Sequence, residues 1–392
     1  MTSLDPPVPG PVTGSRYVVI GAGLAGAATA WHLARDGHEV TLVERTRPAA
    51  TDGSSHGSAR IFRYGYTDRL YAELVVRSRA GFDELEALVG RQLITPTGSV
   101  DFGEERDPRA LAAVLAGLGV EHELLPRAQA QHRFPQLAPD TDVLWHPGAG
   151  VIDAEGTVQA MVDLAVGAGA QLATDWPVAE VRRVGSGYRL LSEDGRTIDA
   201  ERVVVAAGGW LPTLLPRLPL PAGFRSGLPP LEVSQENAYH FPYRDTPEQS
   251  WPTSIHGSAA IQTYTLPGGR DAQFRGQKVA EFNAGLKLST AAHQTGVIDP
   301  ANRARVIAYV EQYLPGLVPE PYAQTTCLFT NTPTEDFVID GVDGITIVSA
   351  CSGHGAKFAP VTGELAAAVA TGDGARVPDR FRLGAAKAPV RA

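Results

Sequence analysis

The first 45 residues combine two hydrophobic patterns. Residues 17–20, Tyr-Val-Val-Ile, form the kind of β-branched run that is typical of a buried parallel strand. After a Gly-rich turn, residues 27–36 are rich in alanine and predict a helix that Gly37 closes. Residues 39–43 predict a second strand, which ends at Glu44. This order of strand, helix and strand predicts a βαβ unit.

The rest of the chain predicts one α/β domain in several pieces, with a mostly β domain inserted into it. Apolar periodicity predicts helices over residues 77–89, 110–118, 160–168 and 363–371. Apolar runs predict strands over 95–102, 178–184, 188–192, 202–206 and 345–350. From about 215 to 330, prolines and glycines multiply and short strands dominate. We assign residues 1–94, 151–230 and 333–392 to the α/β domain, and 95–150 and 231–332 to the inserted domain.

Composition narrows the class of protein. The 392 residues carry 34 basic and 43 acidic side chains, a formal charge of −9, which argues against a nucleic-acid partner. Two cysteines cannot build a disulfide framework or a Cys-rich zinc module, and we expect no metal. No run of about 18 apolar residues predicts a membrane span, and residues 1–15 lack the features of a secretory signal. We expect a soluble, cytoplasmic enzyme.

The turn after the first strand reads Gly21-x-Gly23-x-x-Gly26, the spacing of a dinucleotide-binding fingerprint. Glycines there let the backbone approach a pyrophosphate at a helix N-terminus. Glu44 lies 44 − 21 = 23 positions after Gly21, where a carboxylate can accept hydrogen bonds from ribose hydroxyls. A structural βα turn is the alternative, but strand, helix and acidic residue together favour a nucleotide.

Two later segments favour FAD over NAD. The strand at 202–206 leads into Gly208-Gly209, a second backbone approach to the same nucleotide. The strand at 345–350 leads into Gly353-His354-Gly355, which predicts a helix N-terminus facing the negatively charged end of a reduced flavin. Since no second fingerprint exists for a nicotinamide, we expect electrons to come from an organic substrate.

Four blocks of the sequence together carry a resemblance to a known family. They are the fingerprint at 21–26, the segment 53–63 (GSSHGSARIFR), the segments 327–330 (CLFT) and 336–340 (DFVID), and the segment 352–358 (SGHGAKF). The chain resembles the monomeric sarcosine oxidase family, which includes N-methyltryptophan oxidase and pipecolate oxidase, among the D-amino-acid-oxidase-like flavoproteins. The resemblance implies a p-hydroxybenzoate-hydroxylase-like FAD-binding α/β domain interleaved with a mixed-sheet substrate domain, in a monomer. It also implies that Arg45, Ser55 and Val178 contact FAD.

The resemblance gives Cys327 a specific role, a thioether to the 8α-methyl carbon of the flavin. A thiolate is the nucleophile in such chemistry, and His56 and Arg60 are the basic groups expected to stabilise it. The alternative is a buried structural thiol. Cys351, the other cysteine, is expected to be a buried free thiol, and a disulfide between the two is disfavoured.

The resemblance also assigns the substrate-binding cations. Arg63 and Lys357 match the pair that holds the substrate carboxylate, and an arginine fork with an ammonium suits that task. Surface charges are the alternative, but both residues lie among apolar neighbours in the sequence. Tyr66 and Tyr264 are expected to line the cavity, and the long segment 257–280 to shape its mouth. For Tyr64 and Tyr66 the alternative is that they are core aromatics.

Lys287 matches the family lysine implicated in oxygen activation, and His293 matches a family histidine near the substrate after a small shift in the alignment. A positive charge near the flavin stabilises the superoxide-like species that forms when oxygen accepts the first electron. A solvated strand lysine and a surface-loop histidine are the alternatives.

The predicted reaction is flavin-dependent oxidation of the C–N bond of a secondary or cyclic amino acid by molecular oxygen, giving an imine and hydrogen peroxide. Three alternatives remain from the sequence. They are a biosynthetic tailoring oxidase of a cyclic imino acid, a deglycating oxidase of sugar-modified amino acids, and a non-oxidase flavoprotein subunit that passes electrons to a partner.

Overall fold

The computed structural model describes residues 14–245 and 251–384, and its strands form three sheets. The first sheet has eight strands, ordered β10-β11-β12-β1-β2-β9, with β20 beside β12 and β19 beside β20. β1 pairs in parallel with both β12 and β2, as the predicted βαβ unit requires. Its strands are β1 (Ser15–Ile20), β2 (Val40–Val43), β9 (Gln171–Ala173), β10 (Val178–Val184), β11 (Gly187–Ser192), β12 (Thr197–Val205), β19 (Val338–Val342) and β20 (Ile345–Ser349).

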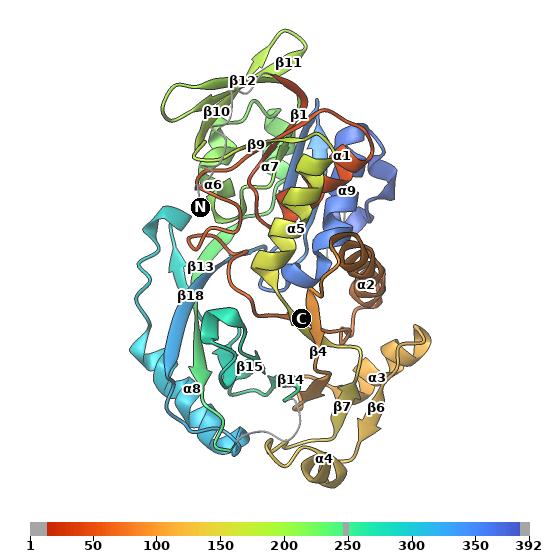
Figure 1. Ribbon diagram of the computed structural model, residues 1–392, viewed down its shortest axis with the longest axis vertical. Coiled ribbons are helices and arrows are strands. Elements are labelled where there is room, and N and C mark those ends of the chain that lie inside the picture. The colour runs from red at the N-terminus through yellow and green to blue at the C-terminus, as the bar shows by residue number, and fades with distance from the viewer. Residues whose placement is uncertain (1–13, 246–250, 385–392) are drawn as a thin grey trace, which may run out of the picture.

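Three helices, α1 (Leu24–Arg35), α5 (Ala154–Gly167) and α9 (Ala359–Thr371), lie together on one face of this sheet (Figure 1). Small residues let α1 and α9 come close: a Cβ on Gly363 would collide with Ala28. The face is therefore a tight alanine-rich layer, and it directs the first turn of α1 toward the carboxyl end of β1.

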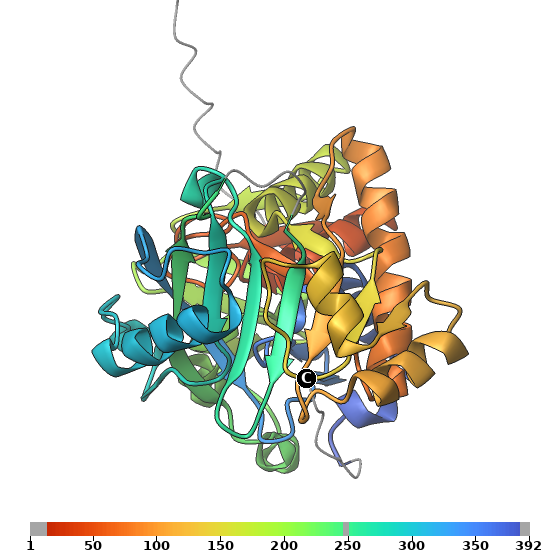
Figure 2. The same ribbon diagram turned by 90° about the horizontal axis from the view of Figure 1, so that it is seen from below.

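The second sheet has nine strands, ordered β17-β13-β16-β15-β14-β5-β7-β6, with β18 along the other side of β13. The helix α8 (Pro300–Tyr313) covers one face of it and buries Val306, Tyr309 and Val310 (Figure 2). The sequence patterns did not predict this helix. The strands are β5 (Ser99–Phe102), β6 (Glu123–Leu125), β7 (Val143–His146), β13 (Glu232–Phe241), β14 (Thr253–Gly257), β15 (Gln262–Pro267), β16 (Gln277–Glu281), β17 (Leu286–Leu288) and β18 (Ala323–Asn331).

A small third sheet, β3-β8-β4, lies between the other two (Figure 1). It consists of β3 (Arg60–Phe62), β8 (Gly150–Ile152) and β4 (Ile94–Pro96). The predicted strand over 95–102 is thus two strands, broken at Gly98, whose φ is +68°. The other helices are α2 (Arg69–Val89), α3 (Pro108–Gly117), α4 (Arg127–Arg133), α6 (Leu211–Leu214) and α7 (Ala222–Gly227).

The mixed α/β fold that the sequence predicts is confirmed, whereas the exact domain boundaries stay a prediction. Strands from the segments assigned to the α/β domain make the first sheet, and those from the inserted segments make the second. In the part of the chain that the structure describes, no helix is long and apolar enough to cross a bilayer.

Candidate active site

A cavity of about 950 Å³ runs from the carboxyl ends of β1 and β2 into the space between the first and second sheets. Its near end is lined by the Gly-rich turn, and its far end by side chains from β3, the loop after β5 and the loop after β20. A cavity at the carboxyl edge of a parallel sheet is where α/β proteins bind nucleotides.

The near end has the shape and polarity for a dinucleotide. Gly21 has a φ of +98°, and a Cβ on Gly26 would collide with the carbonyl oxygen of Gly21. The Glu44 carboxylate accepts a hydrogen bond of 2.6 Å from Ala22 N, which fixes it beside the turn. Ser55 Oγ accepts one of 3.0 Å from Leu24 N at the start of α1. The backbone there leaves room for a pyrophosphate and offers donors to it, so these residues fit the nucleotide part of FAD.

Most residues predicted to bind the cofactor line this one cavity. Gly26 lies behind the turn, packed against Gly21, and His56 is also outside the lining. Burial, Arg60 and Lys278 lower the pKa of His56 to about 4, so His56 is neutral at neutral pH and does not supply the positive charge expected beside Cys327. The predicted cofactor-binding residues that do line the cavity are Gly21, Gly23, Glu44, Arg45, Ser55, Arg60, Val178, Cys327, Gly353, Gly355 and Lys357.

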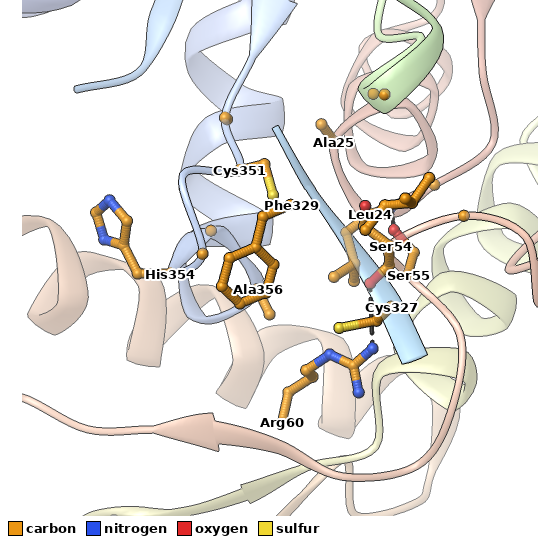
Figure 3. A pocket seen from close by; sticks show the side chains of 18 of the residues that line it. Leu24, Ala25, Ser54, Ser55, Arg60, Cys327, Phe329, Cys351, His354 and Ala356 are labelled. Atoms are coloured by element: carbon orange, nitrogen blue, oxygen red, sulfur yellow. Dashed lines mark hydrogen bonds between the residues drawn. The ribbon is translucent and has the colours of Figure 1, made fainter. Parts of the chain in front are cut away.

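Cys327 lines the cavity, on β18, and its side chain points toward the Arg60 guanidinium (Figure 3). Arg60 itself donates to the carbonyl oxygens of Ala59 and Ser54, at 3.0 and 3.2 Å. Cys351 also lines the cavity, and both cysteines are free thiols. Burial raises the pKa of Cys351. The two thiols therefore differ in surroundings, and Cys327 is the one with a cation before it.

The far end gathers buried cations. Arg63 and Lys357 are 5% and 4% exposed, and both line the cavity. Lys357 Nζ donates to Tyr66 Oη at 3.0 Å and to the carbonyl oxygen of His354 at 2.7 Å, and Arg63 lies over the Tyr66 ring. Burial and the positive charge of Arg63 lower the pKa of Lys357 well below its usual value. Tyr66 thus lies beneath the two cations rather than in the cavity wall.

A second arginine at this end was missed by sequence reasoning. Arg106 is buried and lines the cavity, and its Nε donates to Asp101 Oδ1 at 2.6 Å. Its Nη2 donates to the carbonyl oxygen of Gly65 at 2.6 Å, and Arg63 bonds the same oxygen. Because Asp101 already balances Arg106, Arg63 is left as the cation available to an anionic ligand. Nothing in the sequence near Arg106 signals this partnership, which joins separate strands.

The walls between the two ends are largely aromatic. Phe282 and Phe329 line the cavity with ring centroids 6.0 Å apart, and Tyr264 lines it as expected. Burial raises the pKa of Tyr264. Glu335 also lines the cavity, and burial raises its pKa to about 7 although the Arg63 charge opposes this.

Lys287 and His293 do not lie in the cavity, which corrects the expected positions of both. The Lys287 side chain is 74% exposed, and its Nζ lies 2.6 Å from Glu232 Oε2. Strand alternation explains the error: on β17, Leu288 faces the apolar cluster, so Lys287 faces solvent. His293 is exposed, with Nδ1 2.6 Å from Ser289 Oγ.

In place of Lys287, the structure brings Lys278, on β16, to the cavity. It is 4% exposed, lines the cavity, and has Nζ 3.4 Å from the carbonyl oxygen of Ala59. Burial and the Arg60 charge lower its pKa to about 8, although Cys327 and Asp271 oppose the shift. Sequence reasoning missed Lys278 because Gly285-Leu286-Lys287-Leu288 gave the more obvious local match. Residues 277–280 of β16 are all buried whatever their polarity, so no alternation in the sequence marks Lys278.

A nucleotide cradle joined to a cavity that contains a thiol and buried basic side chains is typical of a flavin-dependent oxidoreductase. Comparison with known proteins gives the family: residues 16–369 match the family described as "DAO: FAD dependent oxidoreductase", and the chain belongs to it. The expected FAD-dependent amine oxidoreductase is thereby confirmed.

Individual relatives agree with this assignment. The chain is 31% identical to a monomeric sarcosine oxidase of Streptomyces avermitilis, over 90% of this chain and 92% of the relative. It is 28% identical to an N-methyl-L-tryptophan oxidase of Yersinia pestis, over 89% and 93%. Among solved structures it is similar to NikD, described as an unusual amino acid oxidase essential for nikkomycin biosynthesis, with a TM-score of 0.82, 25% identity, and coverage of 95% and 98%. The expected resemblance to the sarcosine oxidase family is confirmed.

Proposed function

We propose that this chain oxidises the C–N bond of a secondary (N-methyl) or cyclic amino acid, giving an imine and hydrogen peroxide. The observation that carries the proposal is the pair of buried cations, Arg63 and Lys357, in the same cavity as the nucleotide cradle. The relatives named as sarcosine and N-methyltryptophan oxidases support the same substrate class.

FAD, when bound, supplies a two-electron acceptor between the amine and oxygen. The chain's own part is to hold it: the Gly-rich turn and Glu44 would take the nucleotide, and Cys327 would hold the flavin ring through a thioether. Forming that C–S bond breaks the thiol S–H bond and one C–H bond of the 8α-methyl group, and the two electrons and two protons released would pass through the flavin to oxygen, giving hydrogen peroxide. The Arg60 guanidinium, toward which the Cys327 side chain points, is the positive group beside that sulfur. Cys351, whose pKa burial raises, stays a thiol.

Substrate binding begins at the carboxylate. Arg63, supported by Lys357, fixes it, and the aromatic walls at Phe282 and Phe329 exclude water from the amine. Oxidation converts CH–NH into C=N and releases two electrons and two protons. If the amine binds in its neutral form, no side chain has to remove a proton before the electrons leave.

Oxygen reduction belongs to the part of the cavity around Cys327 and Lys278, which we call the thiol end. Two electrons and two protons convert oxygen to hydrogen peroxide, and the first electron creates an anion that a buried ammonium stabilises. We therefore assign to Lys278 the role expected for Lys287. A monomeric state and a cytoplasmic location, expected from the sequence, are part of the same proposal.

A peroxide-coupled screen tests the function. N-methyl and cyclic amino acids are compared with the amines that lack their carboxylates, using purified protein. We expect peroxide from at least one amino acid and from none of the matched amines. If amino acids bleach the flavin but no peroxide forms in air, the chain passes electrons to a partner and the oxidase proposal is wrong.

A further inference from the structure

One surface carboxylate is anchored on the loop whose backbone contacts the buried Lys278. Asp271 lies on an exposed turn, residues 270–272, between β15 and β16, within the segment that the sequence predicted to shape the substrate mouth. The turn does not line the cavity. It instead packs over the loop before β3, where Ser58 Oγ donates to Asp271 Oδ1 at 2.6 Å and accepts from Asp271 N at 3.1 Å.

These two bonds fix the Asp271 carboxylate over a narrow gap. Gly57, with a φ of +78°, lies beside Asp271 Oδ2 and Arg60 Nη1, which a Cβ there would approach to 2.9 and 3.7 Å. The neighbouring Arg270 is ion-paired with Asp153. Ser58, which anchors Asp271, is adjacent in the chain to Ala59, whose carbonyl oxygen lies 3.4 Å from Lys278 Nζ, so one loop contacts both the carboxylate and the lysine.

The other groups around Lys278 do not supply a fixed counter-charge to its ammonium. His240 pairs with Lys278 across β13 and β16, but burial and the Lys278 charge lower its pKa to about 4, so it is neutral. The positive charge of Arg60 disfavours the charged form of Lys278. Among the contacts of the described residues, the one oxygen within hydrogen-bonding reach of Lys278 Nζ is the neutral carbonyl of Ala59. The titratable or charged groups that act on Lys278 from every side are His56, Arg60, His240, Asp271 and Cys327.

We propose that Asp271 is a positioning residue for the oxygen half of the reaction: its carboxylate, anchored by Ser58, keeps Lys278 as the ammonium within the flavin cavity. The inference rests on the proposed function and deepens it by naming what controls the oxygen site. A buried lysine beside an arginine loses its proton readily, and a fixed carboxylate is the counter-charge that retains it. No bond to Asp271 forms or breaks during the reaction.

The test reads the charge of Lys278 without turnover. The visible absorption spectrum of the resting oxidised holoprotein is titrated with pH, because a charge beside the flavin shifts its bands. Every variant carries Glu335→Gln, because Glu335 also lines the cavity and has a pKa of about 7. This background should show one transition near pH 8, the expected pKa of Lys278, and Lys278→Met should abolish it. Asp271→Asn should lower the midpoint by about one pH unit, a tenfold change in proton affinity.

Matched variants separate charge from structure. Asp271→Glu should restore most of the midpoint, and Asp379→Asn, the same change at an exposed aspartate near the C-terminal end of the described chain, should leave it unchanged. The rate at which the photoreduced protein reacts with oxygen should fall at a correspondingly lower pH in Asp271→Asn. A midpoint or a reoxidation profile that Asp271→Asn does not move overturns the proposal, and so does a transition that survives Lys278→Met.

Failure of the proposed function would give a different result from failure of this inference. The spectral titration uses no amine, so a holoprotein that oxidises no amino acid can still show the shift. A protein that oxidises amino acids without the shift loses this inference alone.

Discussion

The two ends of the cavity both bury positive charge, but they hold it in different ways. At the carboxylate end, Lys357 Nζ has two oxygen partners within 3.0 Å, and Arg106 is bound by Asp101 and by the Gly65 carbonyl. At the thiol end, around Cys327, the Lys278 ammonium has a carbonyl at 3.4 Å, and its counter-charge is on a surface turn.

This difference matches the ligands proposed for each end. A substrate carboxylate is a stable anion that must bind in one orientation, and preorganised donors give that at little cost in entropy. Reduced oxygen is an anion that exists only during the reaction, and a cation with few fixed bonds stabilises it without binding another anion in the resting state. The variants below test whether the two ends are separable in this way.

The largest expected effect is on attachment of the cofactor. Cys327→Ser should release all of its flavin when the protein is precipitated with acid, because no thioether can form, whereas wild type keeps the yellow colour in the pellet. Cys351→Ser is the control, since burial raises the pKa of that thiol and the change should not affect the colour of the pellet. Free flavin from precipitated wild type would show that the thiol end holds FAD without a covalent bond.

Next in size is loss of the carboxylate contact. Arg63→Met should lower kcat/KM for an amino acid substrate about 10²–10³-fold, because removing one partner of a buried charge pair costs about 3–4 kcal/mol. Arg109→Met, at an exposed arginine, is the control. The reoxidation rate of the reduced protein should stay the same in Arg63→Met. A slower reoxidation would mean that the two ends are not separable.

The next variant tests the thiol end. Lys278→Met should slow reoxidation by oxygen about 10²-fold, the scale of losing one preorganised charge at a transition state. Reduction of the flavin by substrate should change little. Lys287→Met serves as a matched control on the neighbouring strand, because its side chain is exposed and ion-paired with Glu232. If Lys287→Met is the slow variant, the sequence match was right and the structural assignment is wrong.

Lys278 and Lys287 also show how much of the site the sequence pattern predicts. Where function depends on local backbone, as in the Gly21 turn or the Gly353-His354-Gly355 segment, spacing alone predicts the cradle, because the glycines and the chain geometry are adjacent in sequence. The same holds for β1, α1 and β2, whose observed bounds lie close to the predicted ones.

Prediction fails where strand register decides. Shifting a strand match by one position exchanges the buried and exposed faces, and the segment from β15 to β17 holds two lysines in similar local sequences. Arg106 was missed for a different reason. Its partner Asp101 is only five positions away, but its bond to the Gly65 carbonyl depends on how the loop after β5 packs against the loop after β3. That second contact is long-range and carries no local signal.

The smallest expected effect concerns ligand affinity at the carboxylate end. Glu335 faces Arg63 and Asp336, and burial raises its pKa to about 7. Below that pH it is uncharged and leaves Arg63 free for a ligand. Above it, the Glu335 anion repels a ligand carboxylate, so affinity should fall as pH rises through about 7. The fall should be at most about tenfold, since one pKa unit corresponds to about 1.4 kcal/mol.

An aromatic carboxylate with no amine is the appropriate probe, because its own charge is constant between about pH 6 and pH 8, the range in which Glu335 titrates. Its dissociation constant, read from the flavin spectrum, should rise with pH in wild type and stay flat in Glu335→Gln. Glu311→Gln, at an exposed position on α8, should behave as wild type. Flat binding in wild type would mean that Arg63 keeps Glu335 ionised throughout. The carboxylate end would then contain one more fixed ion pair, and its contrast with the thiol end would be greater still.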